Sequence, residues 1–498
     1  MGIRSFIAFF FARYVSWKNR SWKKNPLYYQ EKVFQKLISY GKKTEFGKDH
    51  DFLNITSYEE FKKRVPVVDY EGLSVYIQRS LSGGKNILWP KTPIYFTKTS
   101  GTTSGTKYIP ITKESMPHHI VAARDAILSY IDETKNYRLV EGKMIFLQGS
   151  PVLKLKSGIP VGRLSGIVAH HVPFYLQNNR LPSYKTNSIN DWGEKVDKIV
   201  EETVDQNMTL ISGIPPWVQM YFEKIEKKTT KLIKDVFPNF NLFIYGGVNY
   251  TPYKSRIEGL IGKKVDSIEL YPASEGFIAY QDSQKEAGLL LCVNHGMFFE
   301  FVPVDDFLSE SYKRISLSDV VLGVNYVVIL NTDAGLWGYN IGDTVKFVSL
   351  DPYRIVVTGR VKHFTSAFGE HVIGEEVEKS LNESLVKFNV SVNEFHVAPQ
   401  VNPNSGLPYH EWFVEFESEP KNLSLFAKEL DSNLCRINSY YNDLVVGGVL
   451  KPLVLTVVSK GCFRNYMSSI GKLGGQNKVP RLSNNRDIAE KLIKLNRL

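Results

Sequence analysis

Cysteine is scarce in this sequence, and its start has no long apolar run. The chain has 498 residues and three cysteines, Cys292, Cys435 and Cys462, which lie far apart and form no metal-ligand spacing. Because they cannot all pair in disulfides, we expect a reducing, cytoplasmic compartment. The N-terminal apolar run, Phe6 to Ala12, is far shorter than the ~20 residues that span a membrane. No small-residue cleavage site follows it, so the sequence predicts an amphipathic helix that packs on the body.

Acidic residues are missing from residues 1–25, which contain six lysines or arginines. The formal net charge is +11, and residues 451–498 contain ten basic and two acidic residues. The basic N-terminus permits weak peripheral contact with an anionic membrane, although a solvated basic face is the commoner outcome. The basic C-terminal end suits a polyanionic small molecule better than nucleic acid, because RNA-binding aromatics, zinc fingers and basic-region heptads are absent.

The chain contains no H-E-x-x-H motif, no repeat and no low-complexity segment. The adjacent pairs His118–His119 and His170–His171 point in different directions on a helix or a strand, which argues against a zinc site. Residues 26–90 have the pattern of helices joined by turns. From residue 143 to residue 276, strands and helices alternate, which predicts a mostly parallel sheet with helices on its faces. Ligands bind beyond the carboxyl ends of such strands, where the loops 212–216, 245–249 and 271–276 fall.

The most unusual stretch is "TSGTTSGTKYIPIT", residues 99–112, which joins two expected strands. Glycines allow a backbone to approach a ligand closely, and bare N–H groups and hydroxyls can donate to phosphate oxygens. Lys107 adds a positive charge. The stretch is not a Walker A loop, because Gly101 and Gly105 are four apart and Tyr108 follows the lysine. From these residues alone, a phosphate-binding loop and a purely structural loop are equally good interpretations.

Four further positions carry weaker signals, each with a structural alternative. In "YPASEG", Tyr271 could stack on a purine, Ser274 could bond a phosphate oxygen and Glu275 could hold Mg²⁺, or the motif could be a strand-ending turn. Asp343 in "YNIGD" could bind ribose hydroxyls or simply occupy a hairpin turn. Arg360 after a glycine could reach a sugar or a phosphate, or lie on the surface. Lys478 in "GGQNKVPRL" would by itself be considered a solvated lysine.

The ordered set of these motifs resembles the adenylate-forming superfamily of acyl-CoA synthetases and firefly luciferase. The closer resemblance is to the auxin-conjugating acyl-acid amido synthetases, the Gretchen Hagen family, through "TSGTTSGTKYIPIT", "YPASEG", "YNIGD" and "GGQNKVPRL". It extends from about residue 25 to the C-terminus. Two features depart from the plant hormone enzymes: Asn340 replaces an arginine, and "FGEHVIGEE" looks more like acyl-CoA synthetases and the shorter bacterial members. The acceptor is therefore open between an amino acid, another amine and a thiol.

The resemblance implies a role for each motif. The Gly-rich hairpin would hold the ATP phosphates, the second and third loops would bind adenine, the α-phosphate and Mg²⁺, and two later residues would bind the ribose. Lys478 would reach the α-phosphate and the attacking carboxylate, so that Lys478, Lys107 and Glu275 form the catalytic set. The implied ATP-binding residues are Ser100, Gly101, Thr102, Thr103, Ser104 and Lys107 for the phosphates, Gly246, Gly247, Val248 and Tyr271 for adenine, Ser274 for the α-phosphate, Glu275 for Mg²⁺, and Asp343 and Arg360 for the ribose.

The expected fold class is α/β, with a luciferase-like N-terminal domain of sheets flanked by helices and a smaller, mobile α+β domain. We place the N-terminal domain at residues 1–358 and the C-terminal lid, which carries Lys478, at residues 359–498. The expected reaction is ATP-dependent adenylation of a carboxylic acid, followed by acyl transfer to an amine, for which an amino acid is the expected acceptor. The alternatives are a thioester-forming ligase on the same fold and a catalytically silent nucleotide-binding protein.

Overall fold

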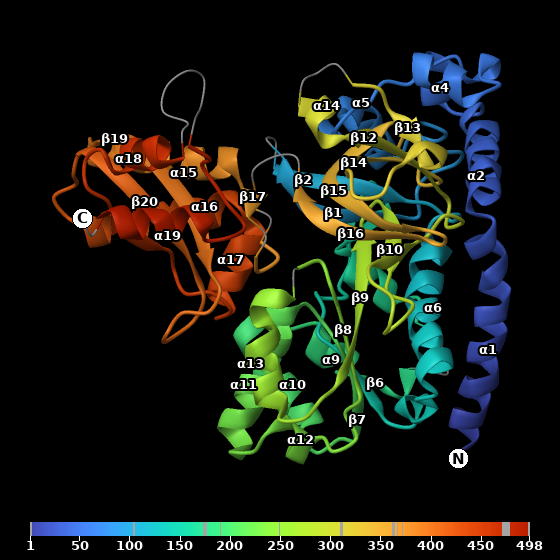
Figure 1. Ribbon diagram of the computed structural model, residues 1–498, viewed down its shortest axis with the longest axis horizontal. Helices are drawn as coiled ribbons and strands as arrows, with labels where there is room; N and C mark the ends of the chain where they lie inside the picture. The colour runs from blue at the N-terminus through green and yellow to red at the C-terminus, as the bar shows by residue number, and fades with distance from the viewer. Residues whose placement is uncertain are drawn as a thin grey trace.

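Helices of the N-terminal part form one edge of the molecule, and the C-terminal elements gather at the opposite side (Figure 1). α1 and α2 follow one another along that edge, and α6 lies between α1 and the strands. The computed structural model describes residues 2–102, 105–172, 177–189, 191–248, 250–308, 312–360, 364–365, 367–370, 372–470 and 479–496.

The first ninety residues are almost entirely helical, as the sequence predicts. Three of the early helices begin after Thr44, Ser57 and Asp69, whose side chains accept hydrogen bonds from free N–H groups of the first turn. These helices and the next long one are α1 (Ile3–Lys24), α2 (Pro26–Gly41), α3 (Glu45–Asp49), α4 (Tyr58–Arg64), α5 (Tyr70–Leu81) and α6 (Met116–Thr134).

A mixed sheet of twelve strands forms the centre of the described structure. In spatial order its strands are β13 (Ile315–Ser316), β12 (Met297–Pro303), β14 (Asn325–Thr332), β15 (Tyr339–Leu350), β16 (Tyr353–Arg360), β11 (Leu289–Leu291), β10 (Gly276–Tyr280), β9 (Asp266–Ala273), β8 (Leu242–Gly246), β7 (Met208–Ser212), β3 (Lys143–Phe146) and β6 (Arg180–Leu181).

The parallel sheet expected from the sequence is only one half of this sheet. Strands β6, β3, β7, β8 and β9 pair in parallel, whereas every pairing from β9 through β10 to β13 is antiparallel. Strand β9 therefore belongs to both halves. The helices in the stretch of chain that contains the parallel strands are α7 (Leu164–Ala169), α9 (Tyr184–Asn187), α10 (Trp192–Thr203), α11 (Pro215–Thr229), α12 (Ile233–Val236) and α13 (Thr251–Ile261).

The Gly-rich stretch forms the expected hairpin in a separate four-stranded sheet. Its arms are β1 (Tyr95–Thr102) and β2 (Gly105–Ile111), which pair antiparallel with Thr99 opposite Lys107. β5 (Ile159–Gly162) runs parallel to β1, and β4 (Lys154–Lys156) pairs antiparallel with β5. The order β2–β1–β5–β4 leaves the hairpin arm that carries Lys107 at an edge of this sheet.

The chain after β16 builds a second, smaller group of elements. A two-stranded ribbon, β17 (Phe364–Thr365) and β18 (Val372–Ile373), precedes a three-stranded sheet of β19 (Ser391–Gln400), β20 (Tyr409–Ser418) and β21 (Val454–Val457). The remaining helices are α14 (Val304–Leu308), in the larger part, and α15 (Gly374–Phe388), α16 (Leu423–Ile437), α17 (Ser439–Val446), α18 (Cys462–Ser469) and α19 (Asp487–Asn496). The domain boundary at residues 358 and 359 stays a prediction.

Two large hydrophobic cores hold these parts together. The first lies between the N-terminal helices and the antiparallel half of the large sheet. The second begins among the helices of the parallel half and continues through Tyr253 and Phe368 to Trp412 of the C-terminal sheet. The C-terminal elements therefore share buried apolar contacts with the helices of the parallel half.

Candidate functional site

Three loops gather at the carboxyl ends of the parallel strands, as the fold predicts. β7, β8 and β9 end at Ser212, Gly246 and Ala273, immediately before or within the three loops identified from the sequence. Gly246 and Gly247, at the end of β8, are required for different reasons. A Cβ at residue 246 would lie 2.3 Å from the carbonyl oxygen of Leu270, whereas Gly247 has a φ of +76°. Only glycine satisfies both conditions, so this loop approaches β9 more closely than other residues allow.

Tyr271 and Asp343, which the sequence assigns to nucleotide binding, are in direct contact. The Tyr271 hydroxyl donates to Oδ2 of Asp343 over 2.6 Å, and both side chains are buried. Strand β15 places Asp343 opposite Arg360 of β16. The side chain of Arg360 lies outside what the structure describes. The sequence-predicted adenine and ribose residues therefore lie at one place, although they belong to opposite halves of the large sheet.

Glu275 lies in the two-residue turn between β9 and β10, beside Ser274. Its Oε1 accepts from the hydroxyl of Tyr339 over 3.3 Å, and the carboxylate is almost fully buried. Tyr339 begins β15, the strand that also carries Asp343. Strand β15 therefore carries one acidic residue of the predicted site, Asp343, and contacts the other, Glu275.

The short segment before α5 joins this strand to the Gly-rich hairpin. Val68 bonds β15 through two backbone contacts, its N–H to Gly338 at 2.9 Å and its carbonyl to Asn340 at 2.8 Å. Two residues later, the Tyr70 hydroxyl accepts from the N–H of Tyr108 over 3.0 Å. The same hydroxyl has its pKa raised by burial. This segment thus places the hairpin beside the strand that carries the acidic residues.

Lys107 is the described cation of the hairpin. Its Nζ lies 5.6 Å from the centre of the Tyr70 ring, on the arm that pairs with Thr99. Gly101 lies in β1. The side chains of Ser100 and Thr102, and the whole of Thr103 and Ser104, lie outside the described residues, so their predicted phosphate contacts stay predictions.

The C-terminal elements contact the hairpin strand directly. The Tyr440 hydroxyl of α17 donates to the backbone carbonyl of Lys98 over 3.0 Å. Arg163, which follows β5, lies 4.3 Å from the Tyr440 ring and forms an ion pair with Asp443. These contacts place α17 next to the base of the predicted phosphate loop.

The segment "FGE" of residues 368–370 contacts the nucleotide loops from the C-terminal side. A Cβ at residue 369 would lie 3.2 Å from Cδ1 of Ile214 and 3.9 Å from Cγ2 of Val248. Glu370 itself does not reach the loops: its Oε1 accepts from Nε2 of the fully buried His410 over 2.8 Å. Glu370, within the stretch "FGEHVIGEE", is therefore internal and fixes this segment on β20.

Lys478 lies outside the described residues, and its predicted role stays a prediction. The chain directly after it is firmly attached to β19. His396 donates through Nδ1 to the carbonyl of Pro480 over 2.7 Å, and Val397 donates to the carbonyl of Arg481 over 2.9 Å. Arg481 also pairs with Glu394. The predicted catalytic lysine therefore precedes a fixed point of the C-terminal sheet by two residues.

Sequence reasoning missed the residues that position the site. Tyr70 and Val68 act through contacts with residues far away in the chain, and no motif marks them. Tyr339 opens the "YNIGD" motif, but no signal in the sequence assigns it a role. A buried lysine was also missed: Lys195 donates to the carbonyls of Gln148 and Asn187, each over 2.9 Å, and burial lowers its pKa to about 8. Because both partners are backbone oxygens, we assign it to holding the loop after β3.

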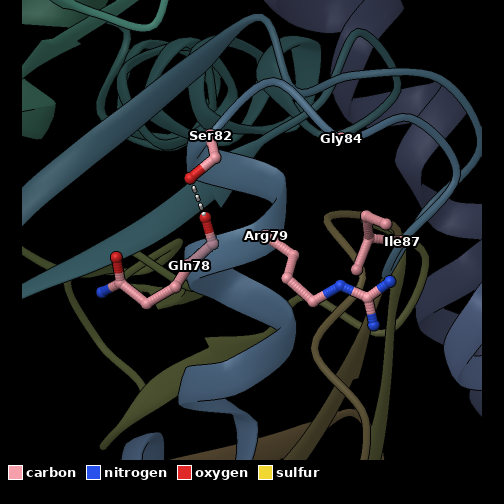
Figure 2. A pocket seen from close by; sticks show the side chains of 5 residues that line it. All are labelled: Gln78, Arg79, Ser82, Gly84 and Ile87. Atoms are coloured by element: carbon pink, nitrogen blue, oxygen red, sulfur yellow. Dashed lines mark hydrogen bonds between the residues drawn. The ribbon is translucent and has the colours of Figure 1, made fainter.

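A surface pocket of about 420 Å³ lies at the end of α5, and none of its lining residues is a predicted site residue (Figure 2). Ser82 donates to the carbonyl of Gln78 over 2.9 Å in its wall, and the one charged lining residue, Arg79, already binds Oε2 of Glu45 over 2.7 Å. Ile87 and Gly84 complete the lining. Without a free charged group, this pocket offers no chemistry and we give it no role.

Metal and membrane features are limited in the part of the chain that the structure describes. No group of three His, Cys, Asp or Glu residues there could hold a metal ion by itself. Within the same residues, no helix combines the length and the apolar character that crossing a membrane requires. A magnesium ion at Glu275 would therefore depend on oxygens of the substrate, which is the usual way that Mg²⁺ is bound with nucleotides.

Comparison with known families gives three successive, separate matches along the chain. The GH3 family N-terminal domain matches residues 19–188, the GH3 family central domain matches residues 290–360, and the GH3 family C-terminal domain matches residues 375–487. Together these stretches take up more than two thirds of the chain. They include the Gly-rich hairpin, Asp343 and Lys478.

Curated relatives resemble the chain over most of its length. Jasmonoyl–L-amino acid synthetase JAR6 of Nicotiana attenuata is 23% identical, over 91% of this chain and 90% of its own. Indole-3-acetic acid-amido synthetase GH3.3 of Arabidopsis thaliana is also 23% identical, over 92% of this chain and 89% of its own.

Solved structures share the fold at lower identity. The GH3.15 acyl acid amido synthetase in complex with 2,4-DB has a TM-score of 0.60 and 16% identity, covering 97% of this chain and 96% of its own. A 2-hydroxyisobutyryl-CoA ligase in the thioesterification state has a TM-score of 0.61 and 13% identity, covering 94% and 91%. These likenesses show the fold, and they include one amide-forming and one thioester-forming enzyme.

Proposed function

The chain belongs to the GH3 family, and from this premise we propose that it is an ATP-dependent acyl-acid amido synthetase. The observation that supports the proposal best is the contact of Tyr271 with Asp343 beside the contact of Glu275 with Tyr339. Strand β15 brings these residues together next to the Gly-rich hairpin. Such a site offers an aromatic ring that could stack on a base, one carboxylate that could bind a ribose and one carboxylate that could bind a cation.

The reaction has two steps that share one site. A carboxylate oxygen attacks the α-phosphorus of ATP, the bond to the pyrophosphate oxygen breaks, and acyl-AMP and pyrophosphate form. The nitrogen of a neutral amine then attacks the acyl carbon, the bond to AMP breaks, and the nitrogen loses a proton as the amide forms. The first step brings two negatively charged groups together, so cations must stabilise its transition state.

We assign the described residues to this chemistry by position. Lys107 lies on the hairpin that would hold the phosphates, and Tyr271 and Asp343 would hold adenine and ribose. A magnesium ion, bound by Glu275 and the phosphates, would reduce the charge on the phosphate oxygens. A single carboxylate with an adjacent hydroxyl fits such an ion, because Mg²⁺ in nucleotide sites takes one or two carboxylates and the phosphates.

We propose an amino acid as the acceptor, because both curated relatives are named for conjugation to amino groups. A cytoplasmic location accords with three free cysteines, two of them buried. The amino acid and the acyl acid both remain to be identified, and the proposal does not depend on which acid is used.

A second candidate, a thioester-forming ligase, has one observation in its favour. The fold matches a CoA ligase as well as it matches an amido synthetase. The sequence favours this candidate through "FGEHVIGEE", which resembles the acyl-CoA synthetase version, and this resemblance stays a prediction.

The test is a screen of carboxylic acids for ATP-dependent pyrophosphate release, followed by products from each accepted acid. We expect amides when amino acids are added and little thioester when CoA is added, both measured by mass spectrometry. Acyl-CoA as the main product would favour the second candidate. ATP binding without pyrophosphate release for any acid would identify a silent nucleotide-binding protein.

A further inference from the structure

The outer face of α1 carries a continuous ridge of large apolar side chains. Their spacing of three and four residues places them on one side of the helix, and each is between 54% and 81% exposed. This apolar ridge consists of Ile3, Phe6, Ile7, Phe10, Tyr14 and Trp17.

The opposite face of α1 is fixed on the protein body. Asn19 donates to Asp125 of α6 over 2.8 Å, and the Trp22 ring lies edge-on to His295 at 6.1 Å. Ala8, Ala12 and Val15 complete this buried face. The ridge is therefore a preformed surface of the folded protein, and a partner that binds it does not have to order a disordered segment.

Positive charges flank the ridge, and α1 itself carries no acidic side chain that could neutralise them. Arg13, Lys18, Arg20 and Lys24 are exposed, and the sequence has no acidic residue before Glu31. The acids on neighbouring elements are already engaged: Glu141 binds the N–H of Gly2 over 3.0 Å, Asp125 binds Asn19 and Arg124, and Asp282 binds Lys23 over 2.7 Å.

We propose that the apolar ridge of α1 docks this protein on the surface of an anionic lipid bilayer. Aromatic and aliphatic side chains of such a helix enter the boundary between headgroups and acyl chains, and the flanking cations attract anionic headgroups. Trp17 and Tyr14 have the amphipathic rings that suit this boundary. The helix is about 33 Å long, and its ridge is straight, so it can lie flat on a plane.

Other occupants of the ridge fit less well. A second copy of the chain would place two helices that carry basic and no acidic side chains against each other, and like charges oppose such a contact. A membrane has no such conflict, because its charge is negative. The inference is independent of the proposed ligase activity, since no residue of the ridge belongs to the predicted nucleotide site.

The experiment is flotation of the full chain with vesicles of phosphatidylcholine alone or with roughly 30% phosphatidylserine, the lipid class that attracts polybasic segments. We expect binding to the anionic vesicles and at least tenfold less to the neutral ones. Raising the salt concentration should release the protein, because salt screens exposed charges.

Three variants separate the contributions of the ridge. The triple variant Phe6→Ser, Phe10→Ser, Trp17→Ser should lose at least tenfold of the vesicle binding. The triple variant Arg13→Gln, Lys18→Gln, Arg20→Gln should lose on the order of 10²-fold, from about 1 kcal/mol per cation. The matched control, Val386→Ser with Leu425→Ser, removes exposed apolar side chains elsewhere and should bind as the parent does.

Trp17→Phe provides a measurement that does not depend on a large surface change. This variant should still bind anionic vesicles. Quenching of its tryptophan fluorescence by brominated lipids should fall strongly, because the six other tryptophans do not lie on the outer face of α1, and Trp22 of the same helix is buried. Absence of vesicle binding by the parent chain would overturn the proposal. A dimer in solution that disappears in the Phe6, Phe10, Trp17 variant would overturn it as well, since a second copy would then cover the ridge.

Discussion

The hydroxyl of Tyr271 donates to Oδ2 of Asp343 over 2.6 Å, although four strand-to-strand steps separate β9 from β15 in the large sheet. In a flat sheet, four steps would place the two strands about 19 Å apart. The sheet must therefore curl strongly between them, where β11 has three residues. This curl closes the predicted nucleotide site, because it brings β9, the last strand of the parallel half, against β15 in the middle of the antiparallel half.

Replacing Asp343 with alanine should weaken ATP binding by about 1.5–3 kcal/mol, the range for hydrogen bonds to a charged group. Isothermal calorimetry on the folded variant measures this directly. Tyr271→Phe is the matched control, since it keeps the ring and removes only the hydroxyl, and we expect a loss of about 0.5–1.5 kcal/mol. Unchanged affinity in Asp343→Ala would remove this residue from the site.

Lys478→Ala should reduce adenylation by on the order of 10²–10³, the effect of losing one preorganised electrostatic group. Negative charge crowds at the α-phosphate only while the carboxylate attacks, so transfer from a supplied acyl-AMP to an amine should fall far less. Single-turnover kinetics of each half-reaction provide the measurement. Lys472→Ala, in the same glycine-containing stretch, is the control and should affect neither step. Equal adenylation rates in Lys478→Ala and the parent would leave Lys478 a surface residue.

Breaking the buried pair of Glu370 and His410 should destabilise the C-terminal sheet. Removing one partner of a buried hydrogen bond costs about 1–3 kcal/mol, because the other polar group is left unsatisfied. We expect Glu370→Ala to lower the opening free energy of β20 amides by this amount in native-state hydrogen exchange. Glu370→Gln keeps a hydrogen-bonding group and should cost clearly less. A loss below about 1 kcal/mol in Glu370→Ala would show that the pair adds nothing to this sheet.

Acid should destabilise the fold through two buried histidines. Burial lowers the pKa of His295 to about 3 and that of His119 to about 4, both from 6.5, and the charges of the neighbouring His118 and Arg124 lower the pKa of His295 further. The unfolded chain therefore binds more protons than the folded chain between these values and pH 6.5. This part of the stability is complete above pH 6.5 and is lost as the pH falls toward 4.

When the pH falls from 6.5 to 5, each of these histidines should lower the free energy of unfolding by about 2 kcal/mol. The pH dependence of thermal unfolding measures the effect, and His295→Gln should reduce its slope. His50→Gln, at a partly buried position, is the control and should leave more of the slope in place. The same slope in His295→Gln and the parent would contradict the assignment. The nearby acidic residue is Asp333, whose Oδ2 lies 3.2 Å from Nε2 of His118.

Local signals allowed the sequence to predict the helices of the parallel half well. α11 and α13 begin at positions with proline in the first turn and end where Thr230 and Gly262 take left-handed backbone conformations. The antiparallel half was not predicted, because β12 and β14 are buried along nearly their whole length and lack an alternating pattern. The family resemblance was confirmed by the three domain matches.

The candidate site was predicted only where a motif marks it. The contact of Tyr271 with Asp343 joins residues 72 positions apart, and that of Tyr440 with Lys98 joins residues 342 apart. Such contacts depend on the curl of the sheet and on the placement of the C-terminal elements, neither of which local patterns describe. Tyr70 and Tyr339 were missed for the same reason.

The segment from Val68 to Tyr70 has a mechanical consequence. Its backbone is bonded to β15 at one end, and its tyrosine holds the N–H of Tyr108 at the other. The hairpin and the strand that carries Asp343 are thus linked by three residues, with no slack between them. We therefore expect a ligand that moves the hairpin to move the start of β15 as well, so that the predicted phosphate and cation sites respond together.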